Sequence, residues 1–219
     1  MKIQALIFDM DGLLFDSERI VQRTWNWAGQ LLGYGNIGEH IYNTLGFNVV
    51  RRGVYFREHF GEDFPMEDFN QMTRRHFFEI TDVEGIPVKK GAFDLLRYGR
   101  EQGLKMVVAT SSRREYATRL LESTGIMEYL DGCVFGDMVT HAKPDPEIYI
   151  RACDIAGIPP ENCMALEDAP AGIRSAYGAG LVPVVVPDLV QPSGEILELC
   201  FCKVQDLTGI IPILEDMKK

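Results

Sequence analysis

The sequence predicts an α/β fold, in which a Rossmann-like parallel sheet forms the core and an all-helical domain is inserted after the first strand. Short apolar runs recur along the chain without the polar alternation of a half-exposed strand, so they are typical of strands buried on both faces. Helical patterns separate the later runs, and strands that alternate with helices indicate a parallel sheet covered on both sides. One long segment after the first run has helical patterns alone.

The composition is that of an ordinary globular protein, and the net charge limits which kinds of molecule the protein is expected to bind. The 219 residues suffice for one large domain, or for a domain with a smaller companion. The formal net charge is −10, which disfavours nucleic acid and anionic membranes as partners, because their phosphates attract basic proteins. An anionic substrate would need a metal ion or a few well-placed cations.

The cysteines and the N-terminal residues favour a cytoplasmic protein. The five cysteines are an odd number and form no Cys-x-x-Cys pair, so we interpret them as reduced thiols rather than as a disulfide framework. The chain does not start with a basic region followed by an apolar stretch and a cleavage site. No apolar run is long enough to span a bilayer. The sequence does not distinguish a monomer from a dimer.

The core elements are expected at defined positions. Apolar, β-branched runs predict strands at 3–8, 106–109, 133–135, 164–166 and 182–186. Apolar side chains at helical spacing predict helices at 91–102, 113–124, 146–156 and 169–179. We therefore assign residues 1–15 and 88–219 to the core domain.

Residues 16–87 form the expected insertion. Ile20, Thr24 and Leu31 lie at helical spacing and predict a first helix. Glycines and a proline then separate further helical segments, which we expect at 37–44, 49–60 and 66–81. The segment Glu84-Gly85-Ile86-Pro87 is the expected linker back to the core.

Chemically active side chains follow the strand runs, at the point where each run ends. The carboxyl ends of parallel strands share one edge of a sheet, and ligands bind at that edge. Residues far apart in the sequence should therefore meet there. These residues are Asp9, Asp11, Thr110, Ser111, Lys143, Glu167 and Asp168.

Each of these signals also has a purely structural explanation. Asp11-Gly12 is a common turn after a strand, and Thr110 or Asp168 could cap the helix that follows. Lys143 could be a solvated residue at the start of a helix. What favours a functional site is the joint occurrence of all these residues, in this order, at strand ends.

In this order the residues resemble four motifs of the haloacid dehalogenase superfamily, in its phosphatase and β-phosphoglucomutase-like branch. The resemblance covers nearly the whole chain, and the insertion is similar to the helical cap domain of one subgroup. The four motifs are Phe8-Asp9-Met10-Asp11-Gly12, Ala109-Thr110-Ser111, Lys143-Pro144-Asp145-Pro146 and Leu166-Glu167-Asp168-Ala169-Pro170-Ala171-Gly172.

The resemblance implies a Mg²⁺-dependent phosphoric monoester hydrolase. Asp9 would attack phosphorus and form an aspartyl-phosphate, and Asp11 would act first as general acid and then as general base. Asp9, the main-chain carbonyl of Asp11 and Asp168 would hold Mg²⁺. Glu167 would be either an additional ligand or a partner of the ligands.

The resemblance also implies a phosphate-binding set. The Thr110 hydroxyl and the Ser111 amide would hold oxygens of the transferring phosphoryl group. Lys143 would balance the charge of that group and of the carboxylates. Positioning and electrostatic stabilisation of this kind are what phosphoryl transfer requires.

Three functions remain open on the motifs alone. We expect a phosphatase acting on a small phosphorylated metabolite, such as a sugar phosphate. A β-phosphoglucomutase-like phosphosugar mutase shares all four motifs and is the main alternative. A catalytically silent binding or regulatory protein on the same fold is another, because a fold does not determine a function. Hydrolytic dehalogenation is disfavoured, since that branch lacks the second aspartate of the first motif.

The insertion favours hydrolysis over the mutase reaction. A mutase must keep water from its aspartyl-phosphate until the sugar phosphate returns, which needs a closing cap with cations for the distal phosphate. Counted from Asp9, Val21 stands where the mutase has a histidine. Residues 45–49 lack the lysine and arginine of the mutase cap, although Arg51 or Arg52 could substitute for them. The identity of the substrate cannot be read from the sequence.

Overall fold

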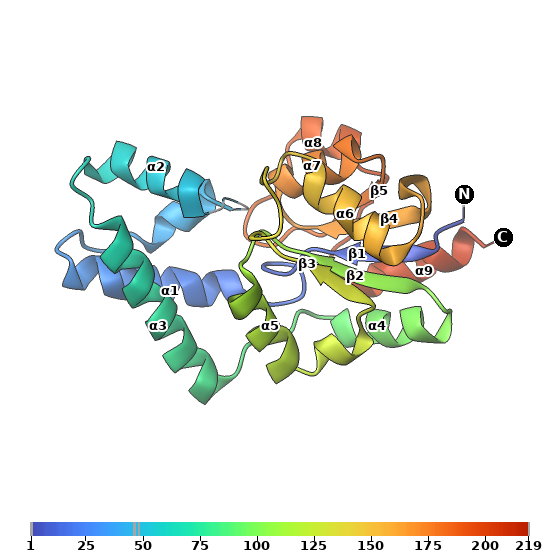
Figure 1. Cartoon of the computed structure of the whole chain (residues 1–219), viewed down its shortest axis with the longest axis horizontal. Coiled ribbons are helices and arrows are strands. Elements are labelled where there is room, and N and C mark those ends of the chain that lie inside the picture. The colour runs from blue at the N-terminus through green and yellow to red at the C-terminus, as the bar shows by residue number, and fades with distance from the viewer. Residues whose placement is uncertain (1, 46, 48, 219) are drawn as a thin grey trace. The chain divides into compact units, whose positions relative to one another are not determined.

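The computed structural model describes residues 2–45, 47 and 49–218 (Figure 1). The chain divides into two compact units. One consists of Met1–Phe15 and Val88–Lys219, and the other of Asp16–Pro87. The chain leaves and re-enters the first unit at neighbouring positions, because Phe15 forms an antiparallel bridge with Val88.

The first unit is built on one sheet, in which the described residues form six strands in the order β3-β2-β1-β4-β5-β6. Every neighbouring pair is parallel. The strands are β1 (Ala5–Phe8), β2 (Lys105–Ala109), β3 (Gly132–Val134), β4 (Cys163–Glu167), β5 (Val182–Val185) and β6 (Cys202–Lys203). All residues of β1 and β4 are buried, including Glu167, which ends β4 beyond the apolar run that predicted this strand. The predicted α/β class with a Rossmann-like parallel sheet is confirmed.

Helices cover both faces of this sheet (Figure 1). On one face α6 and α7 pack through small and apolar residues, and Ala152 of α6 belongs to the same buried cluster as Ile7, Val107 and Ala165 of the central strands. On the opposite face lies α4. The α-helices of the first unit are α4 (Ala92–Glu101), α5 (Arg114–Ser123), α6 (Glu147–Ala156), α7 (Pro170–Gly178), α8 (Gly194–Leu199) and α9 (Ile210–Asp216). Short 3₁₀ turns lie at η2 (Ile126–Tyr129), η3 (Pro160–Asn162) and η4 (Leu207–Gly209).

The strand order creates a switch point between β1 and β4. From β1 the chain adds β2 and β3 on one side of the sheet, and β4, β5 and β6 on the other. The sheet ladder also continues one residue beyond β1, because the Asp9 amide donates to the Leu166 carbonyl at 3.0 Å. In open α/β sheets ligands bind at such a switch point, outside the carboxyl ends of the strands.

The regular elements among the described residues of the second unit are all helices. Its core is aromatic: the Trp25 ring lies edge-on to Phe56 and Phe69, with ring centroids 5.1 and 5.9 Å apart. Its elements are α1 (Ser17–Leu31), η1 (Gly38–Asn43), α2 (Val49–Phe60) and α3 (Met66–Glu84). In the segment 45–49, which differs from the mutase, Gly46 and Asn48 lie outside the described residues.

Several expected boundaries need correction. The first strand begins at Ala5 rather than at residue 3. The segment expected as a helix at 37–44 is a 3₁₀ helix, and the last helix of the insertion runs to Glu84 rather than to residue 81. Among the described helices none is long and apolar enough to cross a membrane.

Candidate active site

The first loop of the site is a tight turn that follows β1. Asp9 is buried directly after the strand, and Gly12 adopts a φ of +83°, which favours glycine. A Cβ atom on Gly12 would lie 2.3 Å from Oδ2 of Asp168. Glycine is therefore required here for a second reason, since it lets the backbone of this loop approach the carboxylate that follows β4.

Three buried carboxylates meet at the switch point. Asp9, Glu167 and Asp168 each offer an oxygen, and these oxygens lie within 4.8 Å of one another. Asp9 follows β1, whereas Glu167 ends β4 and Asp168 comes next. The adjacency of the two strands thus brings together residues that are more than 150 positions apart in the sequence.

Lys143 connects two of these carboxylates. Its ammonium group donates to Oδ1 of Asp9 at 2.6 Å, to Oε1 of Glu167 at 2.6 Å and to the Ala109 carbonyl at 3.0 Å. A lysine has three ammonium protons, so all of them are engaged. Burial lowers the pKa of Lys143, but the charges of Asp9 and Glu167 outweigh this effect and raise the pKa above its usual value. Lys143 therefore stays charged at neutral pH.

The negative charge of Asp9 is only partly compensated by Lys143. Burial has the largest effect on its pKa and raises it, Lys143 lowers it, and Glu167 raises it again. The resulting pKa is about 7, compared with a usual value of 3.8. One lysine is thus too little positive charge for three neighbouring carboxylates. The donors are hard oxygen atoms, and this set fits a divalent cation such as Mg²⁺.

The hydroxyl-bearing loop lies after β2. Thr110 is buried, and its Oγ1 accepts from the Ser112 amide at 3.0 Å. The preceding carbonyl, of Ala109, accepts from Lys143, so Thr110 lies next to the lysine. Ser111 is half-buried, and a Cβ atom at Gly136 would lie 2.1 Å from its carbonyl oxygen. The loop after β3 therefore packs closely on the Thr110–Ser112 turn.

The sequence analysis assigned no role to Tyr116, which contacts Asp11. The Tyr116 hydroxyl donates to Oδ1 of Asp11 at 3.1 Å, and the Ser112 hydroxyl donates to Oδ2 at 2.7 Å. Both donors come from the segment that follows β2. A tyrosine within an apolar helical pattern looks like a core residue, so spacing alone did not indicate this hydroxyl.

The sequence analysis also assigned no role to a second tyrosine, Tyr149. It is fully buried in α6, and its hydroxyl donates to Oε1 of Glu167 at 2.8 Å. Burial, followed by the charge of Glu167, raises the pKa of Tyr149 well above its usual 10.0. The hydroxyl therefore keeps its proton and acts as a donor.

His141, which precedes Lys143 by two residues, belongs to a loop cap rather than to the carboxylate cluster. Its amide and that of Thr140 donate to Oε2 of Glu147, and Arg151 donates to Oε1. The two backbone amides have the largest effect on the pKa of Glu147 and lower it to about 2. Asp145 lies in the same cluster and accepts from the Glu147 amide. These bonds order the loop that carries Lys143.

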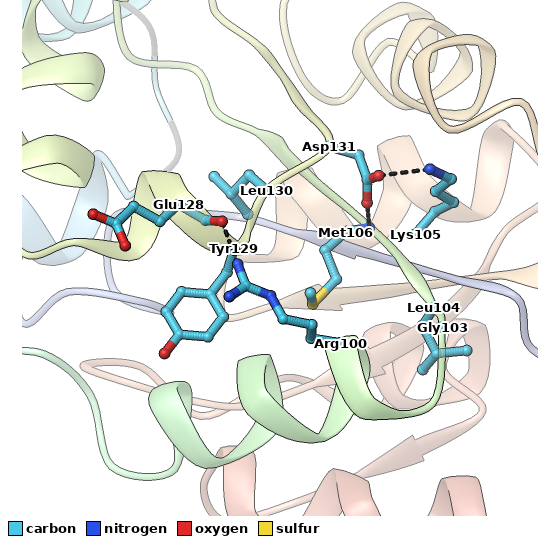
Figure 2. Close-up of a pocket in the computed structure, with 9 residues that line it drawn as sticks. All are labelled: Arg100, Gly103, Leu104, Lys105, Met106, Glu128, Tyr129, Leu130 and Asp131. Carbon is cyan, nitrogen blue, oxygen red and sulfur yellow. Dashed lines mark hydrogen bonds and ion pairs between the residues drawn. The ribbon is translucent and has the colours of Figure 1, made fainter.

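A surface pocket of about 320 Å³ lies at the other edge of the sheet, where β2 begins (Figure 2). Its two basic side chains have partners within the pocket. Lys105 pairs with Asp131 at 2.6 Å, and the Arg100 guanidinium donates to the Glu128 carbonyl and lies 4.2 Å from the centre of the Tyr129 ring. The candidate site residues follow the carboxyl ends of the strands, so this pocket is separate from them.

Comparisons with known proteins agree with the motifs. Residues 3–180 match the haloacid dehalogenase-like hydrolase family. Validoxylamine A 7'-phosphate phosphatase from Streptomyces hygroscopicus subsp. limoneus is 35% identical over 81% of this chain and 83% of the relative. Hexitol phosphatase A from Escherichia coli (strain K12) is 30% identical, over 85% of this chain and 84% of the relative.

A solved structure shares the fold. CbbY from Rhodobacter sphaeroides, solved in complex with phosphate, superimposes with a TM-score of 0.80 at 27% identity. The match covers 95% of this chain and 96% of the CbbY chain. The parallel sheet and the inserted helices thus have their counterparts in a known structure. The chain belongs to the haloacid dehalogenase-like hydrolase family, in its phosphatase and β-phosphoglucomutase-like branch with an inserted helical cap.

Proposed function

We propose that this chain is a Mg²⁺-dependent phosphatase that hydrolyses a small phosphorylated metabolite, with phosphorylated sugars or sugar-like polyols as the favoured substrates. The observation that carries the proposal is the buried pair of Lys143 and Asp9, which lies beside Glu167 and Asp168 at the switch point of the sheet. The substrate class is supported by relatives whose names specify a hexitol phosphatase and a validoxylamine A 7'-phosphate phosphatase.

Asp9 would be the nucleophile. One of its carboxylate oxygens would form a bond to phosphorus while the bond from phosphorus to the leaving alkoxide oxygen breaks. Lys143 holds Oδ1 of Asp9 and so restricts the rotation of the carboxylate before the reaction. Water would then attack the phosphorus of the aspartyl-phosphate, release inorganic phosphate and restore Asp9.

Asp11 would transfer the protons. As a general acid it would protonate the leaving oxygen, and as a general base it would then accept a proton from the attacking water. Ser112 and Tyr116 each donate to one of its oxygens, which keeps the carboxyl group in one orientation. These hydroxyls add two positioning residues to the set expected from the motifs.

Asp9, Asp168 and the main-chain carbonyl of Asp11 would hold Mg²⁺. When bound, the ion would neutralise the carboxylates and stabilise the charge on the phosphoryl oxygens. The close approach of Gly12 to Asp168 supports a shared site for this loop and the end of β4. Oε1 of Glu167 already accepts from two side chains, which favours Glu167 as a partner of Lys143 over a role as metal ligand.

Thr110 and Ser111 would bind the transferring phosphoryl group through a hydroxyl and an amide. Lys143 would contribute charge rather than a free donor, because all its protons are already donated. We propose that residues 16–87 form the cap domain of the family. The cytoplasmic location and the absence of nucleic acid or membrane partners stay predictions from the sequence.

A phosphate-release screen with Mg²⁺ tests this proposal. The panel should include hexitol phosphates, hexose phosphates and a phosphorylated acid as a non-sugar control. We expect release from the sugar and polyol phosphates, and no release from any compound would instead favour a silent binding protein.

The mutase alternative needs its own measurement. β-Glucose 1-phosphate is supplied with a trace of the 1,6-bisphosphate, and both glucose 6-phosphate and inorganic phosphate are followed. We expect inorganic phosphate without isomerisation. Formation of glucose 6-phosphate much faster than phosphate would replace the phosphatase with a mutase.

A further inference from the structure

Tyr149 brings a hydroxyl group into the core beside the candidate site. Its side chain is fully buried in α6 and belongs to the apolar cluster that covers one face of the sheet. A buried hydroxyl needs a hydrogen-bond partner. Here the partner is Oε1 of Glu167, at 2.8 Å.

Glu167 is held from several directions at once. The oxygen that accepts from Tyr149 also accepts from Lys143 at 2.6 Å, and Oε2 accepts from the Ala169 amide at 3.2 Å. A Cβ atom on Gly172 would lie 1.7 Å from Oε1, so the carboxylate is pressed against the first turn of α7. The side chain is thereby restricted to one orientation.

The same contacts continue to Asp9. Lys143 donates both to Glu167 and to Asp9, and its ammonium nitrogen lies 5.0 Å from the centre of the Tyr149 ring. A chain of contacts therefore runs from α6 through the end of β4 and the loop before α6 to the end of β1. All four residues belong to the same compact unit of the protein.

The hydroxyl of Tyr149, rather than its ring, is the part that a phenylalanine could not replace. A phenylalanine would fill nearly the same volume and would present the same ring face to Lys143. It would leave Glu167 with one donor fewer on Oε1. Lys143 would still donate to this oxygen, and the position of its ammonium group between Glu167 and Asp9 would change.

We propose that Tyr149 is a positioning residue of this enzyme, whose hydroxyl acts through Glu167 to hold Lys143 against Asp9. The effect on turnover rests on the proposed phosphatase function. The effect on the Lys143 ammonium group does not, because it follows from the contacts alone.

The test compares Tyr149→Phe with a matched control, Tyr98→Phe. Tyr98 also contacts a carboxylate and a lysine, Glu215 and Lys218, but it lies on α4 and its partners on or just beyond α9, so they take no part in the candidate site. Both variants lose one hydroxyl from such a triad. An effect specific to Tyr149 therefore reports on its place beside Lys143.

The first measurement is proton–nitrogen NMR of the lysine ammonium groups, with the Lys143 signal assigned by its loss in Lys143→Arg. In Tyr149→Phe we expect this signal to shift and its exchange with water to speed up about tenfold, as for the loss of one hydrogen bond to a charged group. Tyr98→Phe should leave it unchanged. An unchanged Lys143 signal in Tyr149→Phe overturns the proposal. If Tyr149→Phe does not fold, 3-fluorotyrosine is placed at position 149 instead, which keeps the ring and changes the acidity of the hydroxyl donor. An unchanged Lys143 signal in that protein overturns the proposal as well.

The second measurement is steady-state kinetics with the substrate found in the phosphate-release screen. We expect kcat of Tyr149→Phe to fall about 10-fold to 100-fold, with KM changed less than about twofold, as for residues that orient a group in direct contact with the reaction. A shifted ammonium signal with unchanged kcat would also contradict the positioning role. If the wild-type protein hydrolyses nothing, the proposed function fails, and the ammonium signal still decides whether Tyr149 positions Lys143.

Discussion

Gly172→Ala should disable the site through a single methyl group. Gly172 lies in the first turn of α7, where an added Cβ atom would meet Oε1, Cδ and Oε2 of Glu167 at 1.7, 1.9 and 2.3 Å. Ordinary van der Waals contact begins near 3.4 Å, so the carboxylate must move by roughly 1.7 Å. Its hydrogen bonds to Lys143 and Tyr149 are 2.6 and 2.8 Å long and would not survive such a displacement.

The magnitude follows from the loss of a buried charge partner. Breaking one side of a buried ion pair costs about 3–5 kcal/mol, and the lower value applies here because Lys143 keeps Asp9. For a chain of this length each kcal/mol lowers Tm by about 2–4 °C, so we expect a fall of about 6–12 °C. A displacement of more than 1 Å beside the reacting groups should also lower kcat about 100-fold.

Gly178→Ala is the matched control in the same helix. A Cβ atom there would lie 3.7 Å from the nearest atom, in the side chain of Pro146, which is an ordinary contact. Alanine should therefore stabilise the helix by up to about 1 kcal/mol and leave phosphate release unchanged. Thermal unfolding and phosphate release are measured on both variants. If Gly172→Ala matches Gly178→Ala in both, the described position of Glu167 is wrong.

Three further predictions concern the site and the loop that carries Lys143. Burial raises the pKa of Asp9 to about 7, so below this pH a bound cation must displace the proton of Asp9. Calorimetry should therefore show the affinity for Mg²⁺ falling about tenfold per pH unit below pH 7. An affinity that stays constant between pH 8 and pH 6 would contradict this. Tyr116→Phe should lower kcat about tenfold while KM hardly changes, because Asp11 loses the Tyr116 hydroxyl as a donor. Unchanged kinetics would remove Tyr116 from the site. The pKa of Glu147 is lowered to about 2 in the fold, so its carboxylate stabilises the fold at pH values above its unfolded pKa of 4.5, and this contribution is lost as the pH falls through 2. In urea at pH 7, Glu147→Gln should therefore be less stable than the wild-type protein. A difference in stability that is smaller at pH 7 than at pH 3 would refute this.

The sheet and the meeting of the charged residues could be predicted because buried strands leave a strong pattern. Apolar runs without polar alternation marked β1, β2 and β4, and the rule that parallel strands share one carboxyl edge placed Asp9 near Asp168. Neither inference needs side-chain packing. The approach of Lys143 to Asp9 follows from the same rule, and the structure gives it a distance of 2.6 Å.

The tyrosines could not be predicted, because helical spacing registers a ring and not the hydroxyl at its end. The apolar pattern of the helix at 113–124 includes Tyr116 for its ring, whereas the pattern of the helix at 146–156 rests on isoleucines and does not include Tyr149, which is buried in α6. Whether the hydroxyl meets water or a carboxylate depends on which loop lies beneath the helix. The partner of each hydroxyl therefore depends on tertiary packing, which decides which side chains position Asp11 and Glu167.

The elements that were missed are short and weakly patterned. Strand β6 has two residues and α8 has six, too few for a period to show. Helix α9 contains a proline, Pro212, in its first turn. A helix tolerates proline there, but in the sequence alone a proline suggests that no helix continues through it.

The central claim is that Asp9 is the nucleophile of a Mg²⁺-dependent phosphatase. The most direct measurement compares phosphate release by the wild-type protein and by Asp9→Asn, with Mg²⁺ and a hexitol phosphate, after thermal unfolding has shown that both proteins are folded. We predict release by the wild-type protein, no release by it in EDTA, and no release above background by Asp9→Asn. Release by folded Asp9→Asn at the wild-type rate would contradict the claim.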